Sequence, residues 1–269
     1  MSVSSYNSHN KKLLVVFILC FNILSIHVFA QQKNYTASNA HAHNDYMHTV
    51  PFHTAFDAGF GSIEADVYPV NGVLYVAHNK KDIQPGHTLK SLYIDPLLHE
   101  LAKDSLRQLK LLIDVKENYK ESLRILLEEI EPLQKYLVAK EKINKPVIIL
   151  ISGERPPPAE YKNYPGYIYF DDDLRLKHTP EEWERVGQVS LSFRRYSNWN
   201  GKDEISNHDK NLLQNVIDSV HHSGKTIRFW EAPDNEKSWK LQMELGADLI
   251  GTDEIDELAA FLNDRQKRK

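Results

Sequence analysis

Three observations predict that this chain folds as one α/β domain, a single (β/α)8 TIM barrel. Short apolar or β-branched runs alternate with amphipathic segments, as buried parallel strands alternate with the helices that cover them. Eight or nine such runs fall within ~230 residues, which suits a barrel. The alternation also fits a doubly wound open sheet. However, no glycine-rich phosphate loop follows the first run, which disfavours that fold.

The expected elements follow one another without a break. Strands are predicted over Asn39–His43, Gly61–Val67, Val73–His78, Leu109–Val115, Pro146–Ile151, Tyr167–Phe170, Gln188–Phe193, Thr226–Trp230 and Asp248–Gly251. Helices are predicted over Phe52–Ala58, Leu92–Ala102, Tyr119–Val138, Lys210–His222, Glu236–Leu245 and Ile255–Leu262. Asn71-Gly72 is typical of a tight hairpin turn. No repeat or linker divides the chain, so we expect one domain.

The first thirty residues are predicted to be a secretory signal peptide. Lys11 and Lys12 precede an apolar run over residues 13–30, which ends on the small residue Ala30. Polar residues interrupt this run, so it is marginal as a membrane span. We expect a signal at residues 1–30 and a barrel at 31–269. The protein is then secreted or periplasmic, and the alternative is an N-terminal membrane anchor.

Composition excludes some functions and draws attention to the histidines. The formal net charge is −4, from 33 Lys plus Arg and 37 Asp plus Glu, which gives no electrostatic reason to expect nucleic acid binding. The single cysteine lies within the predicted signal, so no disulfide is expected. There are 13 histidines, and six of them fall within residues 41–87.

Two predicted strands carry acidic residues where a buried strand should be apolar. Glu64 and Asp66 are two residues apart, so their side chains share one face. Asp114 ends an apolar run on a later strand, and Lys116 shares its face. Buried carboxylates repel one another and lose hydration, and a divalent cation such as Mg²⁺ or Ca²⁺ relieves both costs. Salt bridges or a strand edge facing water are the alternative interpretations.

Two histidines lie on either side of the carboxylate pair in the chain. His43 ends the first predicted strand and His78 ends the third. A neutral and a protonated histidine together suit general acid–base catalysis. His41 shares a face with His43, and spacing does not decide which of the two acts on a substrate. For any single histidine, a packed or surface role is the alternative.

Several short motifs carry a resemblance to a known superfamily. Six motifs stand in the same order as in the glycerophosphodiester phosphodiesterase signature. They are Ala42-His43, Pro51, Ala55-Phe56-Asp57-Ala58-Gly59, Glu64-Ala65-Asp66-Val67, Asn71-Gly72 and His78. Residues 111–116 and 246–253 are similar to the third metal strand and the final strand of this superfamily, which includes phosphatidylinositol-specific phospholipase C (PI-PLC). Residues 39–46, 197–201 and 228–235 more closely resemble the family of altered inheritance of mitochondria protein 6 and its bacterial relatives.

The resemblance implies a PI-PLC-like TIM-barrel phosphodiesterase. Such an enzyme is a metal-dependent phosphoric diester hydrolase or lyase that acts on a glycerophosphodiester or phospholipid-type head group. Carried over to this sequence, it makes His43 and His78 the acid/base pair and Glu64, Asp66 and Asp114 the ligands of one Mg²⁺ or Ca²⁺. Substrate contacts are expected from Lys116, Asn44, His41, Arg228 and Trp230. The expected partners are a small phosphodiester or phospholipid and, transiently, a membrane surface, with no nucleic acid and no obligate protein partner.

Two departures from the signature bear on the substrate. Asn44-Asp45 stands where the signature has Arg-Gly, and His78-Asn79 stands where it has His-Asp. Two other functions are alternatives to a phosphodiesterase. One is an amidohydrolase-like metallohydrolase with zinc on His41 and His43, although the middle strands offer no further histidine. The other is a non-catalytic barrel that binds phosphorylated head groups. For Arg228 and Trp230, packing of the arginine on a core tryptophan is the alternative.

Overall fold

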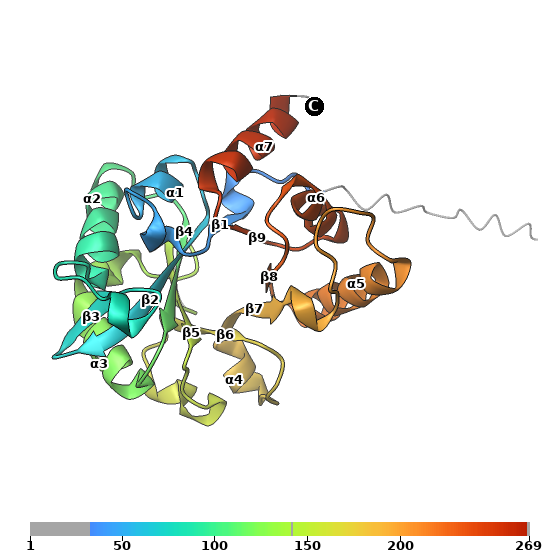
Figure 1. Ribbon diagram of the computed structural model, residues 1–269. Helices are drawn as coiled ribbons and strands as arrows, with labels where there is room; N and C mark the ends of the chain where they lie inside the picture. Colours follow the sequence, from blue (N-terminus) through green and yellow to red (C-terminus); the bar gives the residue numbers. More distant parts are fainter. Residues whose placement is uncertain (1–32, 141, 268–269) are drawn as a thin grey trace, which may run out of the picture. The chain divides into compact units, whose positions relative to one another are not determined.

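Parallel strands form the centre of the fold, as the sequence predicts. The computed structural model describes residues 33–140 and 142–267, and Figure 1 shows their strands enclosed by helices. The parallel strands are β1 (Ala40–Ala42), β2 (Ser62–Val70), β4 (Leu109–Val115), β5 (Val147–Gly153), β6 (Ile168–Asp172), β7 (Val186–Ser192), β8 (Ile227–Trp230) and β9 (Ile250–Thr252). The predicted signal peptide lies outside the described residues and stays a prediction.

The sheet is nearly closed into a barrel. Its strand order is β8-β7-β6-β5-β4-β2-β1-β9. The two ends meet where Arg228 forms an isolated parallel bridge with Leu249 and the Asp248 N–H donates to the Ile227 carbonyl at 2.9 Å. The barrel prediction is therefore confirmed, and the open-sheet alternative is wrong. Within the described residues, no helix is long and apolar enough to span a membrane.

A further strand, β3 (Val73–Val76), pairs antiparallel with β2 and lies outside the barrel order. The turn residues Asn71 and Gly72 have φ values of 50° and 78°, the left-handed region that a tight hairpin requires, so the predicted hairpin is confirmed. The prediction that His78 ends this strand is wrong, because β3 ends at Val76. The Ala77 N–H still donates to the Asp66 carbonyl at 3.2 Å and holds the following loop beside β2.

Seven α-helices are present in the described residues. They are α1 (His53–Asp57), α2 (Asp95–Lys103), α3 (Tyr119–Glu129), α4 (Pro180–Glu184), α5 (Asn207–His222), α6 (Glu236–Leu245) and α7 (Ile255–Lys267). The helix predicted over Tyr119–Val138 is too long. A 3-10 segment over Glu131–Tyr136 replaces its second half, since Pro132 has no N–H to donate. Helix α4 was not predicted, although Thr179 and Glu182 form a capping box at its start.

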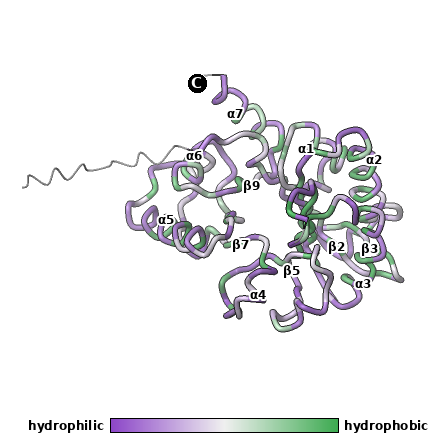
Figure 2. The backbone as a smooth tube through the Cα atoms, turned by 180° about the vertical axis from the view of Figure 1, so that it is seen from behind, coloured by the Kyte–Doolittle hydropathy of each residue, from purple (hydrophilic) through white to green (hydrophobic). Residues whose placement is uncertain are grey.

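The two faces of the barrel strands differ in polarity. The outward side chains of β2, Ile63 and Ala65, are fully buried in the core cluster, and Figure 2 shows hydrophobic positions along β2 and its neighbours. The alternate side chains Ser62, Glu64 and Asp66 are also buried. TIM-barrel interiors are mainly filled by branched apolar residues. A polar interior is stable only where its groups are paired, so these polar side chains mark a candidate site within the barrel.

Candidate active site

The carboxyl ends of the barrel strands surround a cavity of about 330 Å³. Its lining comprises His43, Glu64, Asp114, Lys116, Ser152, Gly153, Arg155, Asp171, Asp173, Arg175, Ser190, Arg228 and Trp230. Six predicted site residues are in this set: His43, Glu64, Asp114, Lys116, Arg228 and Trp230. TIM-barrel enzymes carry their chemistry at this end of the barrel, where the loops after the strands meet.

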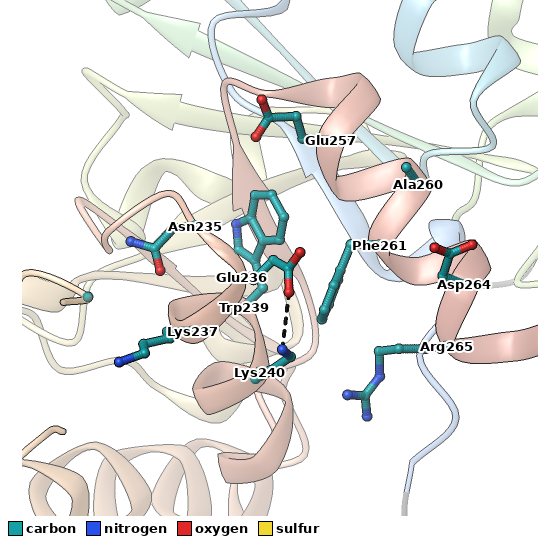
Figure 3. Close-up of a pocket in the computed structure, with 11 residues that line it drawn as sticks. Asn235, Glu236, Lys237, Trp239, Lys240, Glu257, Ala260, Phe261, Asp264 and Arg265 are labelled. Atoms are coloured by element: carbon teal, nitrogen blue, oxygen red, sulfur yellow. Dashed lines mark hydrogen bonds and ion pairs between the residues drawn. The ribbon is translucent and has the colours of Figure 1, made fainter. Parts of the chain in front are cut away.

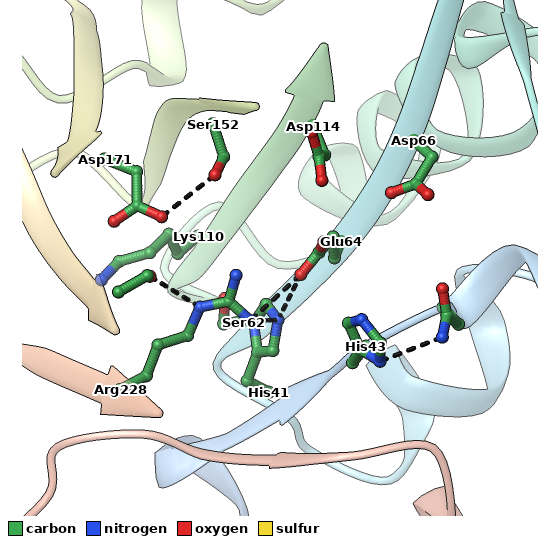
Figure 4. Close-up of polar contacts among 12 residues, drawn as sticks. His41, His43, Ser62, Glu64, Asp66, Lys110, Asp114, Ser152, Asp171 and Arg228 are labelled. Carbon is green, nitrogen blue, oxygen red and sulfur yellow. Dashed lines mark hydrogen bonds and ion pairs between the residues drawn. The ribbon is translucent and has the colours of Figure 1, made fainter. Parts of the chain in front are cut away.

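Three carboxylates from two adjacent strands converge here, and two of them, Glu64 and Asp114, line the cavity. Glu64 and Asp66 lie on β2, the strand register pairs Asp66 with Asp114 of β4, and one ligand oxygen from each lies within 4.8 Å of the others. Figure 4 shows the three side chains close together. Burial and the neighbouring Glu64 and Asp114 raise the pKa of Asp66 to about 6. The sequence spacing and the strand register thus assemble one acidic cluster.

Two cations partly neutralise the acidic cluster. Lys116 Nζ lies 2.8 Å from Asp66 Oδ2 and 3.0 Å from Asp114 Oδ2, and Arg228 Nη1 lies 3.1 Å from Glu64 Oε2. These carboxylates hold the pKa of Lys116 above its usual range despite the burial that opposes it. Three carboxylates against two cations leave one negative charge, and the oxygen-only donor set fits a hard divalent cation such as Mg²⁺ or Ca²⁺. Within residues 33–140 and 142–267, this is the one cluster of three or more such ligands.

Gly153 makes room for the third carboxylate. It ends β5 with a φ of 68°, and a Cβ at this position would lie 2.0 Å from Asp114 Oδ1 and 2.3 Å from the Val115 carbonyl oxygen. A side chain therefore meets backbone atoms that cannot move aside. This close approach explains why a glycine stands directly beside the acidic cluster.

Replacing Gly153 with alanine is expected to reduce both stability and divalent-cation affinity. The overpacking should cost about 1–3 kcal/mol beyond the strain of a left-handed alanine, and it should push Asp114 out of the cluster. The matched control is Gly86→Ala, because Gly86 has a φ of 83° with nothing within 4 Å of its Cβ position. Urea unfolding and calorimetric cation titration measure the two effects. Equal losses in both variants would contradict the contact argument.

His41 lies beneath the cavity and not in it. Its side chain is fully buried, its Nδ1 is 2.7 Å from Ser62 Oγ, and its Nε2 is 2.8 Å from Glu64 Oε2 and 2.6 Å from Arg228 Nη1. Burial and the adjacent guanidinium lower the pKa of His41 to about 3, so the ring is neutral. With both ring nitrogens engaged and a cation beside one of them, His41 is a poor zinc ligand. This geometry argues against the His41/His43 zinc pair.

His43 lines the cavity and is held by a carboxylate from the other end of the chain. Its Nδ1 is 2.7 Å from Asp253 Oδ1, and the side chain is 39% exposed. Burial alone would lower the pKa of His43, but the hydrogen bond that His43 donates to Asp253 and the nearby Glu64 raise this pKa above its usual value. Asp253 directly follows β9, which neighbours β1 in the sheet. An imidazole oriented in this way is suited to proton transfer.

His78 is linked to the acidic cluster through Tyr46. The Tyr46 hydroxyl lies 2.6 Å from Asp66 Oδ2, 2.8 Å from Asn44 Oδ1 and 3.3 Å from His78 Nδ1. The other group of the Asn44 amide, Nδ2, donates to Asp253 Oδ1 at 3.2 Å. Asn44 therefore links Asp253, the partner of His43, to Tyr46, the partner of His78. It is not among the residues that line the cavity, and its substrate contact stays a prediction. His78 is half exposed and is not among the residues that line the cavity.

Arg228 and Trp230 share a face of β8 but differ in burial and in their contacts. Arg228 is buried, and its Nε donates to Ser190 Oγ at 2.8 Å while its Nη1 reaches Glu64. Trp230 is 44% exposed at the cavity rim. The alternative of an arginine packed on a core tryptophan is therefore wrong, because the tryptophan is not in the core.

Sequence reasoning missed several residues of the site. Tyr46 and Asp253 orient the two histidines, Gly153 admits Asp114, and Arg155 with Asp171 completes the far wall of the lining. Tyr46 and Asp253 lie in the motifs at residues 39–46 and 246–253, but the resemblance of these motifs to known families assigned no role to either residue. Arg155 lies just after β5, and Asp171 lies near the end of β6. Their position at the carboxyl end of a barrel strand could have identified them as candidate site residues.

A larger cavity of about 910 Å³ lies on the outside, between α6 and α7 (Figure 3). Trp239 and Phe261 form part of it, with ring centroids 5.5 Å apart, and Lys240 pairs with Glu236 at 3.1 Å. None of the predicted site residues lines this cavity. Size alone therefore does not identify the candidate site, because the predicted site residues line the smaller cavity.

Comparisons with known proteins agree with the fold and with these motifs. Residues 30–171 match the AIM6-like phosphodiesterase domain. Altered inheritance of mitochondria protein 6 of Eremothecium gossypii is 26% identical over 270 residues, covering 83% of this chain and 69% of that protein. Its homologue in Arthroderma benhamiae is 25% identical over 263 residues, covering 80% and 81% respectively.

Two solved structures share the fold. A glycerophosphodiester phosphodiesterase from Parabacteroides distasonis has a TM-score of 0.50 at 17% identity, covering 80% of this chain and 89% of that one. A Ca²⁺-dependent phosphatidylinositol-specific phospholipase C from Streptomyces antibioticus has a TM-score of 0.55 at 10% identity, covering 83% and 93%. At these identities the structural similarity establishes the barrel fold, whereas the chemistry depends on the residues of the site.

Proposed function

Because the chain belongs to the AIM6-like phosphodiesterase family, we propose that it cleaves phosphodiesters of the glycerophosphodiester or phospholipid head-group type with the help of one Mg²⁺ or Ca²⁺. One observation carries this proposal. His43, the carboxylates Glu64 and Asp114, and the cations Lys116 and Arg228 line one cavity at the carboxyl end of the barrel. That combination matches what an anionic diester, a hard cation and an acid–base step each require.

The reaction follows from the two oriented histidines. A divalent cation on Glu64, Asp66 and Asp114 would supply charge neutralisation at the phosphodiester oxygens. His43 accepts a proton at Nε2 from the nucleophile, because its Nδ1 is held by Asp253. His78, held at Nδ1 by Tyr46, donates a proton at Nε2 to the leaving alcohol. The nucleophile forms the new bond to phosphorus and the bond to the alcohol oxygen breaks. If the nucleophile is a hydroxyl of the substrate, the product is a cyclic phosphate.

Replacing Asp253 with asparagine is expected to lower kcat about 10- to 100-fold and to shift the pH profile. A base must be unprotonated, so activity falls as the pH drops through the His43 pKa. Asp253 raises that pKa, so its neutral replacement lowers it and moves the acid limb of kcat/KM to lower pH. The measurement is kcat/KM from pH 4 to 9, with Asp256→Asn on α7 as the control. An unchanged acid limb would show that Asp253 does not act through His43.

We also propose that phospholipid substrates are reached at a membrane surface after export. The loops that follow β1 and β6 leave Met47, Val50, Leu174 and Leu176 exposed, at the end of the barrel that carries the cavity. Such side chains favour transient insertion among lipid head groups. The predicted signal at residues 1–30 would direct the protein out of the cytoplasm, with membrane anchoring as the other outcome.

A substrate panel tests the proposed function. The protein is assayed with Mg²⁺ or Ca²⁺, and with a chelator, against glycerophosphodiesters, lysophospholipids, sphingomyelin and phosphatidylinositol. We expect cation-dependent release of one alcohol from at least one class. Absence of cleavage across the panel, or activity that survives the chelator, would overturn the proposal. Separating a cyclic phosphate from a linear one distinguishes the lyase from the hydrolase reaction.

A further inference from the structure

Part of the cavity wall is formed by arginines that the proposed reaction does not use. Arg155 follows β5 and Arg175 follows β6, and both line the cavity together with Asp173. Arg175 Nε donates to Asp173 Oδ2 at 2.6 Å, and Arg195 Nη1 donates to the Asp173 carbonyl at 3.1 Å. Two guanidinium groups, those of Arg155 and Arg175, thus share the single carboxylate of Asp173, whereas Arg195 binds only its backbone carbonyl. Asp171, the other acid of this wall, forms no ion pair with either arginine among the described residues.

Arg155 is the informative member of this group. Its side chain is only 19% exposed, yet its Nη2 lies 3.6 Å from Asp173 Oδ2, which is too long for a hydrogen bond. A contact with the Tyr161 hydroxyl engages part of the guanidinium. A guanidinium has five N–H donors, and a largely buried one is costly unless they are used. Arg155 lines the same cavity as Glu64 and Asp114 of the acidic cluster.

We propose that Arg155 and Arg175 form a subsite for a second anionic group, so that the preferred substrates are phosphodiesters with a further negative charge, such as a phosphate monoester, on one of their two alcohols. The inference rests on the proposed function and specifies its substrate class. Guanidinium groups bind phosphate through paired N–H donors, which fits a fork placed across the cavity from the reacting phosphorus.

The wall is badly suited to a cationic head group. A quaternary ammonium is held by several aromatic faces and by carboxylates that lack competing cations. Trp230 is the one aromatic side chain in the described lining, and Arg155 and Arg175 would repel a positive charge. A neutral polyol could hydrogen-bond here but would leave Arg155 and Arg175 sharing one carboxylate.

Three soluble diesters that share a glycerophosphoryl group test the subsite. Their second alcohol is glycerol, glycerol phosphate or choline. We expect kcat/KM for the glycerol phosphate diester to exceed that for the glycerol diester by about 10- to 100-fold, with the choline diester lowest. Arg155→Ala and Arg175→Ala should remove that advantage and leave the glycerol diester nearly unchanged, while Arg155→Lys should retain part of it. Arg194→Ala, on the neighbouring loop outside the described lining, is the control.

The outcomes separate this inference from the proposed function. Equal rates on the glycerol and glycerol phosphate diesters would overturn the subsite and leave the diesterase proposal standing. The exposed Arg175 makes its alanine variant a safe second test if Arg155→Ala does not fold. If none of the three diesters is cleaved, calorimetric titration with glycerol 3-phosphate decides. Binding that weakens about 10-fold in Arg175→Ala supports the subsite, and binding that does not change overturns it.

Discussion

Asp114→Asn is expected to lower divalent-cation affinity by more than about 100-fold and to reduce diester cleavage to background. Asp114 contributes one of three carboxylates whose ligand oxygens lie within 4.8 Å of each other, and it is also a partner of Lys116 at 3.0 Å. The neutral amide has one poor ligand oxygen and no charge. The cluster then holds two carboxylates against two cations, so the electrostatic reason to bind a divalent cation disappears.

Two measurements keep this expectation apart from misfolding. Calorimetric titration with Mg²⁺ and Ca²⁺ reads cation affinity directly, and near-UV circular dichroism reads the packing of the barrel. Glu244→Gln on α6 removes an exposed carboxylate with only a loose pair to Lys210 at 3.9 Å, so it should leave both unchanged. Wild-type cation affinity in Asp114→Asn would show that the cation does not bind at this cluster.

The barrel was predictable because periodicity reports which residues are buried in strands and helices. The predicted strand Leu109–Val115 has the same bounds as β4, and the parallel order with a closing bridge at Arg228 confirms the fold class. The errors lie where backbone chemistry outweighs periodicity. Apolar spacing continues past Glu129, yet Pro132 ends the α-helical hydrogen bonding there, and no periodic signal reports that.

The site was partly predictable for a different reason. A residue spacing of two places Glu64 and Asp66 on one face, and that is a local property of a strand. The partners of His41 depend on closure of the barrel, which brings Arg228, 187 residues away in the chain, within 2.6 Å of the ring. The polar contact between Lys110 and Gln188, 2.5 Å apart inside the barrel, is of the same kind. Sequence patterns assign faces to strands, but only the closed sheet decides which side chains meet.

His43→Ala is expected to lower kcat by about 10²- to 10⁴-fold with little change in stability, because His43 is partly exposed and its main contact is Asp253. His41→Ala is expected to act in the opposite way. It leaves Ser62 Oγ, Glu64 and Arg228 short of a buried partner and opens a cavity, at a cost of roughly 2–4 kcal/mol in the free energy of unfolding.

Urea unfolding and steady-state kinetics on both variants decide between the two histidines, which the sequence alone could not do. Added imidazole should restore part of the turnover of His43→Ala, since a small base can occupy the space of the missing ring, but should do nothing for His41→Ala. His222→Ala, at the exposed end of α5, controls for the loss of a surface imidazole. If His41→Ala were as stable as wild type and rescued by imidazole, the assignment would reverse. The base would then be the buried histidine, whose pKa of about 3 and fully engaged nitrogens make it the weaker candidate.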